Sequence, residues 1–419
     1  MEKITLPVRR YLQTSWKVSW ILILVFLPFT SFPLISKFTG GTLVAPLSIL
    51  PLIWLVFTWL PYYFIKGKTL PGELKPLLIF VFFVLLSSGF AFFILMPYFK
   101  GHTIQKEELE AIGTLGIGFA FLLTAVTRVQ SRKQIFNSLA WINVGGILFL
   151  FWSLVQTSMI VFNNGSLPPV IDSIQRAISV ANLRGSITTL RIYGLTLEPS
   201  WLAHSLNMLY LPVWLAASRF KVSAFRFRLG KLTVENFLLI FGIIAMFLTY
   251  SRIGLISFLF ILAWFIVDIS TSISKRIADY KKRKSSKSVV TNKYFVTGAM
   301  IFVLISSFVI LLYTLSLKDY RFRKLLEIET YTSESFSFMT IARKAAFAER
   351  VAFWEFGWEV FNEYPILGVG LGNVGQFSET YLSAQAWTMD EVRNLLFYAT
   401  TLPNTKSLWV RLLSETGLV

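Results

Sequence analysis

Long apolar segments recur along the whole chain, and they constrain its fold more than any other feature. Of the 419 residues, 55% are hydrophobic and only 15% are charged, whereas soluble proteins usually have about 25% charged residues. A helix of about 20 apolar residues is long enough to cross the hydrocarbon core of a membrane. The segments predicted to cross are about 18–36, 42–64, 77–97, 108–127, 138–162, 199–218, 233–250, 253–270 and 294–316, and a tenth begins near 406.

This pattern predicts an all-α fold, namely a polytopic transmembrane helical bundle of about ten or more spans. Residues 1–316 are expected to form the first nine spans, with an outer loop at 163–198. Residues 317–405 are expected to form a large periplasmic loop containing amphipathic helices. Residues 406–419 are expected to begin a further span that is truncated.

Basic residues are concentrated in alternate loops, which predicts the orientation of the chain. An excess of Lys and Arg marks cytoplasmic loops, so the net charge of +18 is attributed to topology and not to nucleic-acid binding. Segment 318–405 differs, because its eight Lys/Arg and eleven Asp/Glu give −3. The N-terminus and the basic loops are therefore predicted to be cytoplasmic; these loops contain Lys66/Lys68/Lys75, Arg128/Arg132/Lys133, Arg219/Lys221/Arg226/Arg228/Lys231 and the cluster at 275–287.

The apolar run 237–267 contains 31 residues and a single charge, Arg252. Basic segments at 219–231 and 275–287 flank the run, and both are predicted to be cytoplasmic. The run must then go out and return as a hairpin, with its tip at 249–254. Arg252 would lie at the outer interface, where an arginine either extends its charge to water or binds a ligand.

Two more arginines, Arg191 and Arg350, lie on other segments predicted to be outside. The planar guanidinium group suits phosphate better than lysine does, and an outer-leaflet anion with an apolar tail would be a polyprenyl pyrophosphate. Glu198 follows Arg191 and opens the sixth span, so it either caps that helix or acts as a base. The sequence contains no DxD motif, no His/Asp cluster and no cysteine, so no metal and no cofactor is predicted.

The large loop contains a predicted amphipathic helix. Its apolar stripe would place Trp354 and Trp358 toward the bilayer or the bundle, with Arg343 and Arg350 near the stripe. The stripe consists of Phe347, Val351, Trp354, Trp358 and Phe361. The run GVGLGNVG at 368–375 follows. Because no βαβ unit surrounds its G-x-G-x-x-G pattern, we interpret it as a turn that lets the backbone approach a ligand or another helix.

Four pieces in this order resemble the O-antigen ligase and polysaccharide polymerase superfamily, which are C-type membrane glycosyltransferases. The pieces are RIYGLTLEPSWLAH, LTYSRIGLI, ERVAFWEFGWEVFNEYPILGVGLGN and LPNTKSLWVRLLSETGLV, within residues 185–419. The resemblance implies metal-independent, inverting transfer of an undecaprenyl-pyrophosphate-linked glycan to a glycan acceptor on the periplasmic face of the bacterial inner membrane. A chain-length regulator is a further candidate partner, besides the lipid bilayer.

By position, the resemblance implies catalytic roles for Arg191, Arg252 and Arg350, to which we add Glu198. Substrate contacts are predicted at Trp354, Tyr250, Asn404 and Arg343. Ligases of the superfamily usually carry histidine and asparagine where this chain has Pro403–Asn404. This departure favours a repeat-unit polymerase, with an O-antigen ligase as the alternative.

Three other classes of membrane protein fit the sequence less well. A lipid-linked oligosaccharide flippase would place cations inside the bundle, often with internal repeats, and the sequence has neither feature. A channel or secondary transporter is disfavoured because intramembrane charge is scarce. An intramembrane protease would need a Ser–His or paired-Asp site, and His204 has no evident serine partner.

Overall fold

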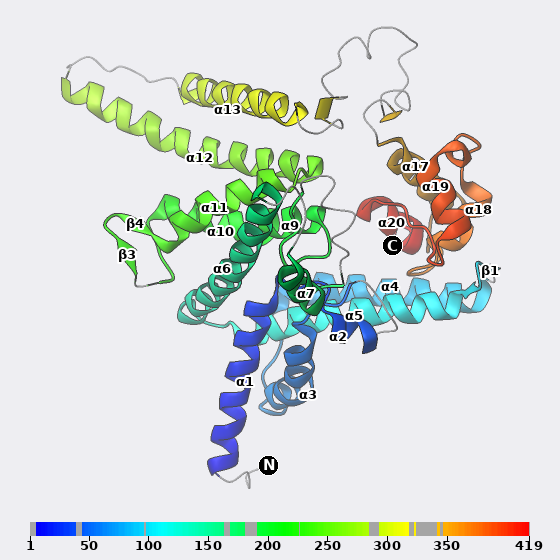
Figure 1. Cartoon of the computed structure of the whole chain (residues 1–419). Helices are drawn as coiled ribbons and strands as arrows, with labels where there is room; N and C mark the ends of the chain where they lie inside the picture. The colour runs from blue at the N-terminus through cyan, green and yellow to red at the C-terminus, as the bar shows by residue number, and fades with distance from the viewer. Residues whose placement is uncertain are drawn as a thin grey trace. The chain divides into compact units, whose positions relative to one another are not determined.

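A computed structural model shows that the chain is helical, which confirms the all-α prediction (Figure 1). The described part divides into two compact units, one of residues 1–63 and 124–315 and the other of residues 64–123 and 316–419. Parts of the predicted loops at 163–198 and 317–405, and of the cluster at 275–287, lie outside the described residues. The structure describes residues 6–38, 44–95, 98–162, 168–180, 191–225, 227–284, 293–317, 322–323, 342–343 and 347–418.

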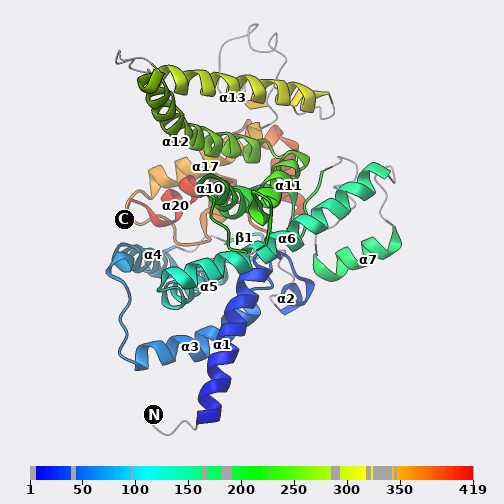
Figure 2. The same cartoon turned by 90° about the vertical axis from the view of Figure 1, so that its left-hand side faces the viewer.

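The first unit consists of helices and one short hairpin. In chain order its elements are α1 (Leu6–Phe26), α2 (Pro33–Phe38), α3 (Ile49–Ile65), α6 (Arg132–Phe162), α7 (Pro169–Ile178), α9 (Pro199–Ser205), the π-helix η2 (Leu206–Tyr210), α10 (Leu211–Phe220), β3 (Arg228–Leu229), β4 (Leu232–Thr233), α11 (Val234–Leu248), α12 (Arg252–Lys284) and α13 (Lys293–Ser316). The helices α1 and α3 lie side by side in both views (Figures 1 and 2), where the indole N–H of Trp16 donates to Thr58 Oγ1 at 2.9 Å.

The core of the first unit is built around Trp214, which is fully buried. Its indole N–H donates to Asn143 Oδ1 at 2.9 Å, and Asn143 Nδ2 donates to Glu235 Oε1 at 3.2 Å. A Cβ atom at Gly242 would lie 2.6 Å from the Trp214 ring, and one at Gly146 would lie 2.9 Å from it. Glycine at these positions therefore lets α6 and α11 close around the tryptophan.

The second unit combines the helices α4 and α5 with the helical C-terminal region. Its elements are the 3₁₀ helix η1 (Gly72–Leu74), α4 (Lys75–Ile94), β1 (Tyr98–Phe99), β2 (His102–Thr103), most of α5 (Ile104–Arg128), α17 (Ala348–Glu363), η3 (Val374–Phe377), α18 (Ser378–Tyr381), η4 (Ala386–Thr388), α19 (Asp390–Arg393), the π-helix η5 (Asn394–Tyr398) and α20 (Leu408–Thr416). The β1–β2 turn has positive φ at Lys100 and Gly101, the conformation of a tight hairpin turn.

Five helices in the described part of the chain are long and apolar enough to cross a membrane. They are Gly72–Phe93, Ile104–Arg128, Arg132–Met159, Arg252–Ile277 and Tyr294–Ser316. Two shorter apolar helices, α3 and α11, match two of the other predicted spans. The structure thus contains apolar helices where several spans are predicted, while the number of ten or more stays a prediction.

Two predicted boundaries are wrong, and a proline accounts for one of them. The first predicted span, 18–36, is instead α1, which ends at Phe26 because Pro28 follows closely, and then the separate helix α2. The span predicted at 199–218 corresponds to the contiguous helical segment α9, η2 and α10 from Pro199 to Phe220, in which the π-helix η2 precedes Pro212. The cluster predicted as a loop at 275–287 is helical through Lys284, because α12 continues into it.

Candidate functional site

The 31-residue apolar run breaks where the hairpin tip is predicted. The helix α11 ends at Leu248 and α12 begins at Arg252; in Figure 1, α11 enters this turn from the left and α12 leaves it to the left. Tyr250 has a φ of 49°, a conformation that reverses the chain direction at some cost for a bulky residue. Ser251 Oγ accepts the backbone N–H of Gly254 at 3.2 Å and thereby caps α12.

The arginine of a distant segment contacts this turn. The Nε–H of Arg191 donates to the carbonyl oxygen of Thr249 at 2.9 Å, and the next residue's N–H donates to Leu248 O at 3.2 Å. Thr249 is fully buried, while Arg191 and Arg252 are both partly exposed. The fold of the first unit therefore places Arg191 beside the turn from which Arg252 begins α12.

Glu198 lies at the N-terminus of α9, and its side chain does not cap that helix. Its carboxylate accepts the hydroxyl of Ser200 at 2.7 Å and is exposed. The helix α9 and the following π-helix pack against the first turn of α12, because Asn207 Nδ2 donates to Gly254 O at 2.8 Å. Glu198 thus belongs to a segment that meets the α11–α12 turn, with a carboxylate not used as a backbone cap.

The other predicted site residues lie in the second unit. Arg350 is exposed in the first turn of α17, and Arg343 is also exposed. Trp354 is half-buried, packs against Phe347 with ring centroids 6.0 Å apart, and has a buried indole N–H without a hydrogen-bond partner. The predicted aromatic stripe is only partly correct, because Trp358 is 47% exposed. The buried face is instead formed by Ala348, Val351, Ala352, Phe353, Phe356, Gly357 and Val360.

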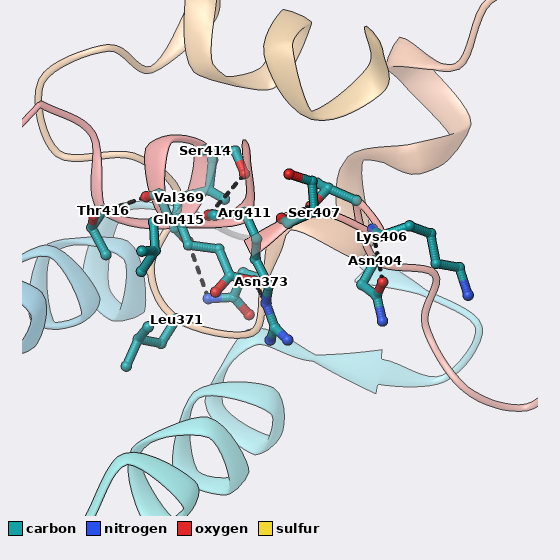
Figure 3. Close-up of polar contacts among 12 residues, drawn as sticks. Val369, Leu371, Asn373, Asn404, Lys406, Ser407, Arg411, Ser414, Glu415 and Thr416 are labelled. Atoms are coloured by element: carbon teal, nitrogen blue, oxygen red, sulfur yellow. Dashed lines mark hydrogen bonds and ion pairs between the residues drawn. The ribbon is translucent and has the colours of Figure 1, made fainter. Parts of the chain in front are cut away.

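The backbone of the glycine run 368–375 packs against the helix α20. This agrees with the second alternative predicted for the run, in which its backbone approaches another helix. The N–H of Gly370 donates to Glu415 O at 2.9 Å, and the N–H groups of Gly372 and Val374 hydrogen-bond the Glu415 carboxylate. Arg411 Nε donates to the same carboxylate at 2.9 Å. Figure 3 shows this end of α20 beside the loop that carries Asn373. The buried charge of Glu415 is therefore compensated by an ion pair and by backbone donors.

A polar cavity of about 270 Å³ lies next to this contact in the second unit. Asn404, a predicted substrate contact, lines it and is exposed, with its side-chain oxygen accepting the N–H of Lys406 at 3.0 Å. Pro403 at the neighbouring position is buried, and its carbonyl oxygen would lie 2.3 Å from a Cβ at Gly375. The full lining is His102, Glu107, Glu110, Ala111, Thr114, Gly372, Val374, Thr401, Leu402, Pro403, Asn404, Arg411 and Glu415.

Residues of the β1–β2 hairpin hold one wall of this cavity. His102 Nδ1 bonds Glu107 Oε1 at 2.5 Å, and its Nε2 bonds the carbonyl oxygen of Thr400 at 2.6 Å. Both ring nitrogens of His102 therefore lie within hydrogen-bond distance of an oxygen atom. Lys100 Nζ donates to Ala399 O at 2.7 Å, and burial lowers the pKa of Lys100 from its ordinary value. The hairpin thereby positions the segment that ends at Asn404.

The segment from α11 to α20 also matches a known family. Residues 237–419 match the family model described as O-antigen ligase. This match confirms the resemblance to the O-antigen ligase and polymerase superfamily, and together with the five apolar helices it indicates a membrane protein. The same comparisons find no match among curated proteins or solved structures.

The matched segment 237–419 contains most of the features described above. It includes the turn with Arg252, the helix α17 with Arg350, and the cavity wall with Asn404. Arg191 and Glu198 precede the matched segment, and Arg191 contacts it through its bond to Thr249. The match supports an enzyme of the ligase and polymerase type.

Three residues around the cavity are missed by sequence reasoning. Arg411 and Glu415 are four residues apart, so helical spacing could have indicated their ion pair. His102 contacts Thr400, which is 298 residues away in the sequence. No local pattern indicates that contact.

Proposed function

We propose that the chain is a glycosyltransferase that acts on undecaprenyl-pyrophosphate-linked glycan units at the periplasmic face of the bacterial inner membrane. The observation that carries this proposal is the bond from Arg191 Nε to Thr249 O, beside the turn that begins α12 with Arg252. Two guanidinium groups of separate segments meet the requirement for binding a pyrophosphate without a metal ion. The N-terminus of a 33-residue helix adds favourable partial positive charge.

In the proposed reaction, a hydroxyl of the acceptor sugar attacks the anomeric carbon of the donor sugar. The new C–O bond forms as the bond to the pyrophosphate oxygen breaks, and undecaprenyl pyrophosphate leaves with that electron pair. Arg191 and Arg252 stabilise the charge that develops on the leaving group. Glu198 accepts the hydroxyl proton, since its carboxylate is exposed and contacts only a serine hydroxyl among the described residues.

Arg350 and Trp354 are proposed to assist from the large loop. Arg350 is exposed at the start of α17 and would contact the pyrophosphate or an acidic sugar. Trp354, whose buried indole N–H has no hydrogen-bond partner, is proposed as a substrate contact. Arg343, Tyr250 and Asn404 are proposed as further substrate contacts.

We favour repeat-unit polymerisation over ligation to a lipid or protein acceptor. Ligases of the superfamily usually have histidine where this chain has Pro403, and Pro403 is buried against Gly375. No side chain that could remove a proton exists at that position. Ligation stays the alternative function, because the matching family is described as O-antigen ligase.

The test is reconstitution of the full chain in liposomes with an undecaprenyl-pyrophosphate-linked repeat unit. A polymerase would convert the single unit into a ladder of longer glycans and release undecaprenyl pyrophosphate. A ligase would form product only after a separate acceptor is added. Translocation of the donor across the bilayer without any new glycosidic bond would instead identify a flippase and refute both enzymatic functions.

A further inference from the structure

A second cavity, in the first unit, is lined by two cations and by no carboxylate. It has a volume of about 330 Å³ and lies between α1, the start of α6 and the last residue of α5. Its lining residues are Gln13, Lys17, Trp20, Ile21, Arg128, Gln134, Asn137, Ser138 and Trp141. Such a set of residues has an uncompensated positive charge, with neutral amide and hydroxyl groups around it.

Arg128 is the more constrained of the two cations. Its guanidinium lies 4.5 Å from the centroid of the Trp59 ring, and its Nε is buried without a hydrogen-bond partner. Within the described residues, neither Arg128 nor Lys17 forms an ion pair with a carboxylate. A desolvated cation without a counter-charge is costly. A bound anion would offset that cost and also reduce the repulsion between the two cations.

The position of the cavity indicates what kind of anion it would bind. Arg128 ends one candidate span, and Arg132 begins the next, so the cavity is at the level where the two spans end. Trp20 and Trp141 line it, and tryptophan is enriched at the depth of lipid headgroups. The indole N–H of Trp20 is bonded to Ser138 Oγ at 3.1 Å, which fixes one wall. Basic pockets between the cytoplasmic ends of membrane helices bind anionic lipid headgroups.

This cavity is separate from the proposed donor site. Gln156 of α6 accepts the N–H groups of Tyr193 and Gly194, next to Arg191. Ser138, at the other end of α6, lines the cavity. The two positions are 18 residues apart along one continuous helix, or roughly 27 Å, which is close to the thickness of a hydrocarbon core. The cavity is therefore about one bilayer thickness away from the proposed chemistry.

We propose that this cavity binds the phosphate of an anionic phospholipid headgroup, with Lys17 and Arg128 as the anion ligands. Free phosphate has the same charge chemistry, but the tryptophan walls and the position at the ends of two spans favour a lipid. The proposal does not depend on the glycosyltransferase function, because it concerns other residues at the other end of α6.

The test is native mass spectrometry of the purified full chain with phosphatidylglycerol or phosphatidylcholine added. We expect phosphatidylglycerol to bind about tenfold more tightly than phosphatidylcholine. Lys17→Gln should weaken phosphatidylglycerol binding about fivefold, the contribution of one basic residue near an anionic surface. Lys17 is exposed on α1, so this variant should keep its fold, whereas Arg128→Gln removes a group packed on Trp59.

The matched control is Lys133→Gln, which removes the same charge from the same region at an exposed residue that does not line the cavity. It should bind phosphatidylglycerol like the unmodified chain. Equal binding of the two lipids, or an equal loss in Lys133→Gln and Lys17→Gln, would overturn the proposal. Millimolar inorganic phosphate that raises the melting temperature, without any preference for phosphatidylglycerol, would identify a free-phosphate site and refute the lipid assignment.

Discussion

At the scale of single residues, lysine variants of Arg191 and Arg252 can distinguish a catalytic role from that of an interfacial anchor. The partly exposed Arg252 begins a membrane-length helix, where an arginine that only reaches water could be replaced by lysine. Arg191 donates its Nε–H to Thr249 O and so contacts the turn that precedes Arg252. Lysine keeps the charge of either residue but not the planar arrangement of donors.

We predict that Arg252→Lys leaves the protein level unchanged and lowers glycan polymerisation at least about tenfold, or roughly 1.4 kcal/mol of transition-state stabilisation. Polymer ladders from cells that carry the variant measure the effect. Arg132→Lys, at the exposed start of α6, is the matched control and should polymerise normally. Full ladders from Arg252→Lys would leave Arg252 as an interfacial anchor.

Arg191→Lys should also lower polymerisation. This variant should in addition loosen the α11–α12 turn, because the Nε–H of Arg191 donates to Thr249 O. If both arginines bind one leaving group, the double variant should lose less activity than the product of the two single losses. Single-turnover rates of the three variants with the lipid-linked donor measure this coupling. Strictly multiplicative losses would indicate two independent sites.

At the scale of elements, the sequence periodicity of α17 predicts the helix correctly but only part of its buried face. The sequence predicts an amphipathic helix there, and the helix is present. Its predicted stripe is only partly the buried face, because Val351 is buried whereas Trp358 is 47% exposed. Small residues such as Ala352 and Gly357 face the core instead, and a Cβ at Gly357 would lie 2.4 Å from Thr405.

We therefore predict effects of very different size for two neighbouring aromatic residues of α17. Phe356 is 1% exposed and Trp358 is 47% exposed. Phe356→Ala should lower the free energy of unfolding by about 3–5 kcal/mol, the usual cost of a buried aromatic side chain. Trp358→Ala should cost far less in detergent. Denaturation followed by tryptophan fluorescence and by circular dichroism measures both losses, and a loss for Trp358→Ala as large as that for Phe356→Ala would contradict the observed difference in burial.

A second prediction at the scale of elements concerns the glycine run at 368–375. Gly370 has a φ of 81°, and a Cβ there would lie 2.4 Å from Glu108 Oε1. Gly370→Ala should therefore disrupt the loop that holds Glu415 and lower the melting temperature strongly. Gly118→Ala in α5 is the matched control, because nothing lies within 4 Å of its Cβ. Thermal unfolding of the two variants compares them directly, and a silent Gly370→Ala would contradict the observed packing.

At the scale of the whole molecule, sequence patterns predict the helical class and the break in the 237–267 run, since both depend on local composition. They do not predict the bond from Arg191 to Thr249 or the one from His102 to Thr400, which join segments 58 and 298 residues apart. Nor do they predict that the N–H groups of the glycine run bind Glu415. These contacts depend on tertiary packing, which leaves no periodic signal in a single sequence.

The proposed reaction depends on the predicted membrane topology. The exposure of individual residues in the structure shows where an introduced cysteine can test that topology. The chain has no cysteine, so a single introduced thiol reports without background. Thr249 and Ser251 at the tip are buried, whereas Ile253 is 57% exposed and Lys133 is also exposed. Ile253→Cys should therefore react with an impermeant maleimide added to the periplasmic side, and Lys133→Cys should react only after the membrane is permeabilised.

This outcome follows from charge, because Arg132 and Lys133 lie in a basic loop predicted to be cytoplasmic, and the run must return after the tip. If Lys133→Cys reacts from outside and Ile253→Cys does not, the α11–α12 turn faces the cytoplasm. Arg191 would face the cytoplasm with it, because it is bonded to that turn. The proposed site would then lie on the wrong face for a periplasmic lipid-linked donor, whatever the arginine variants show.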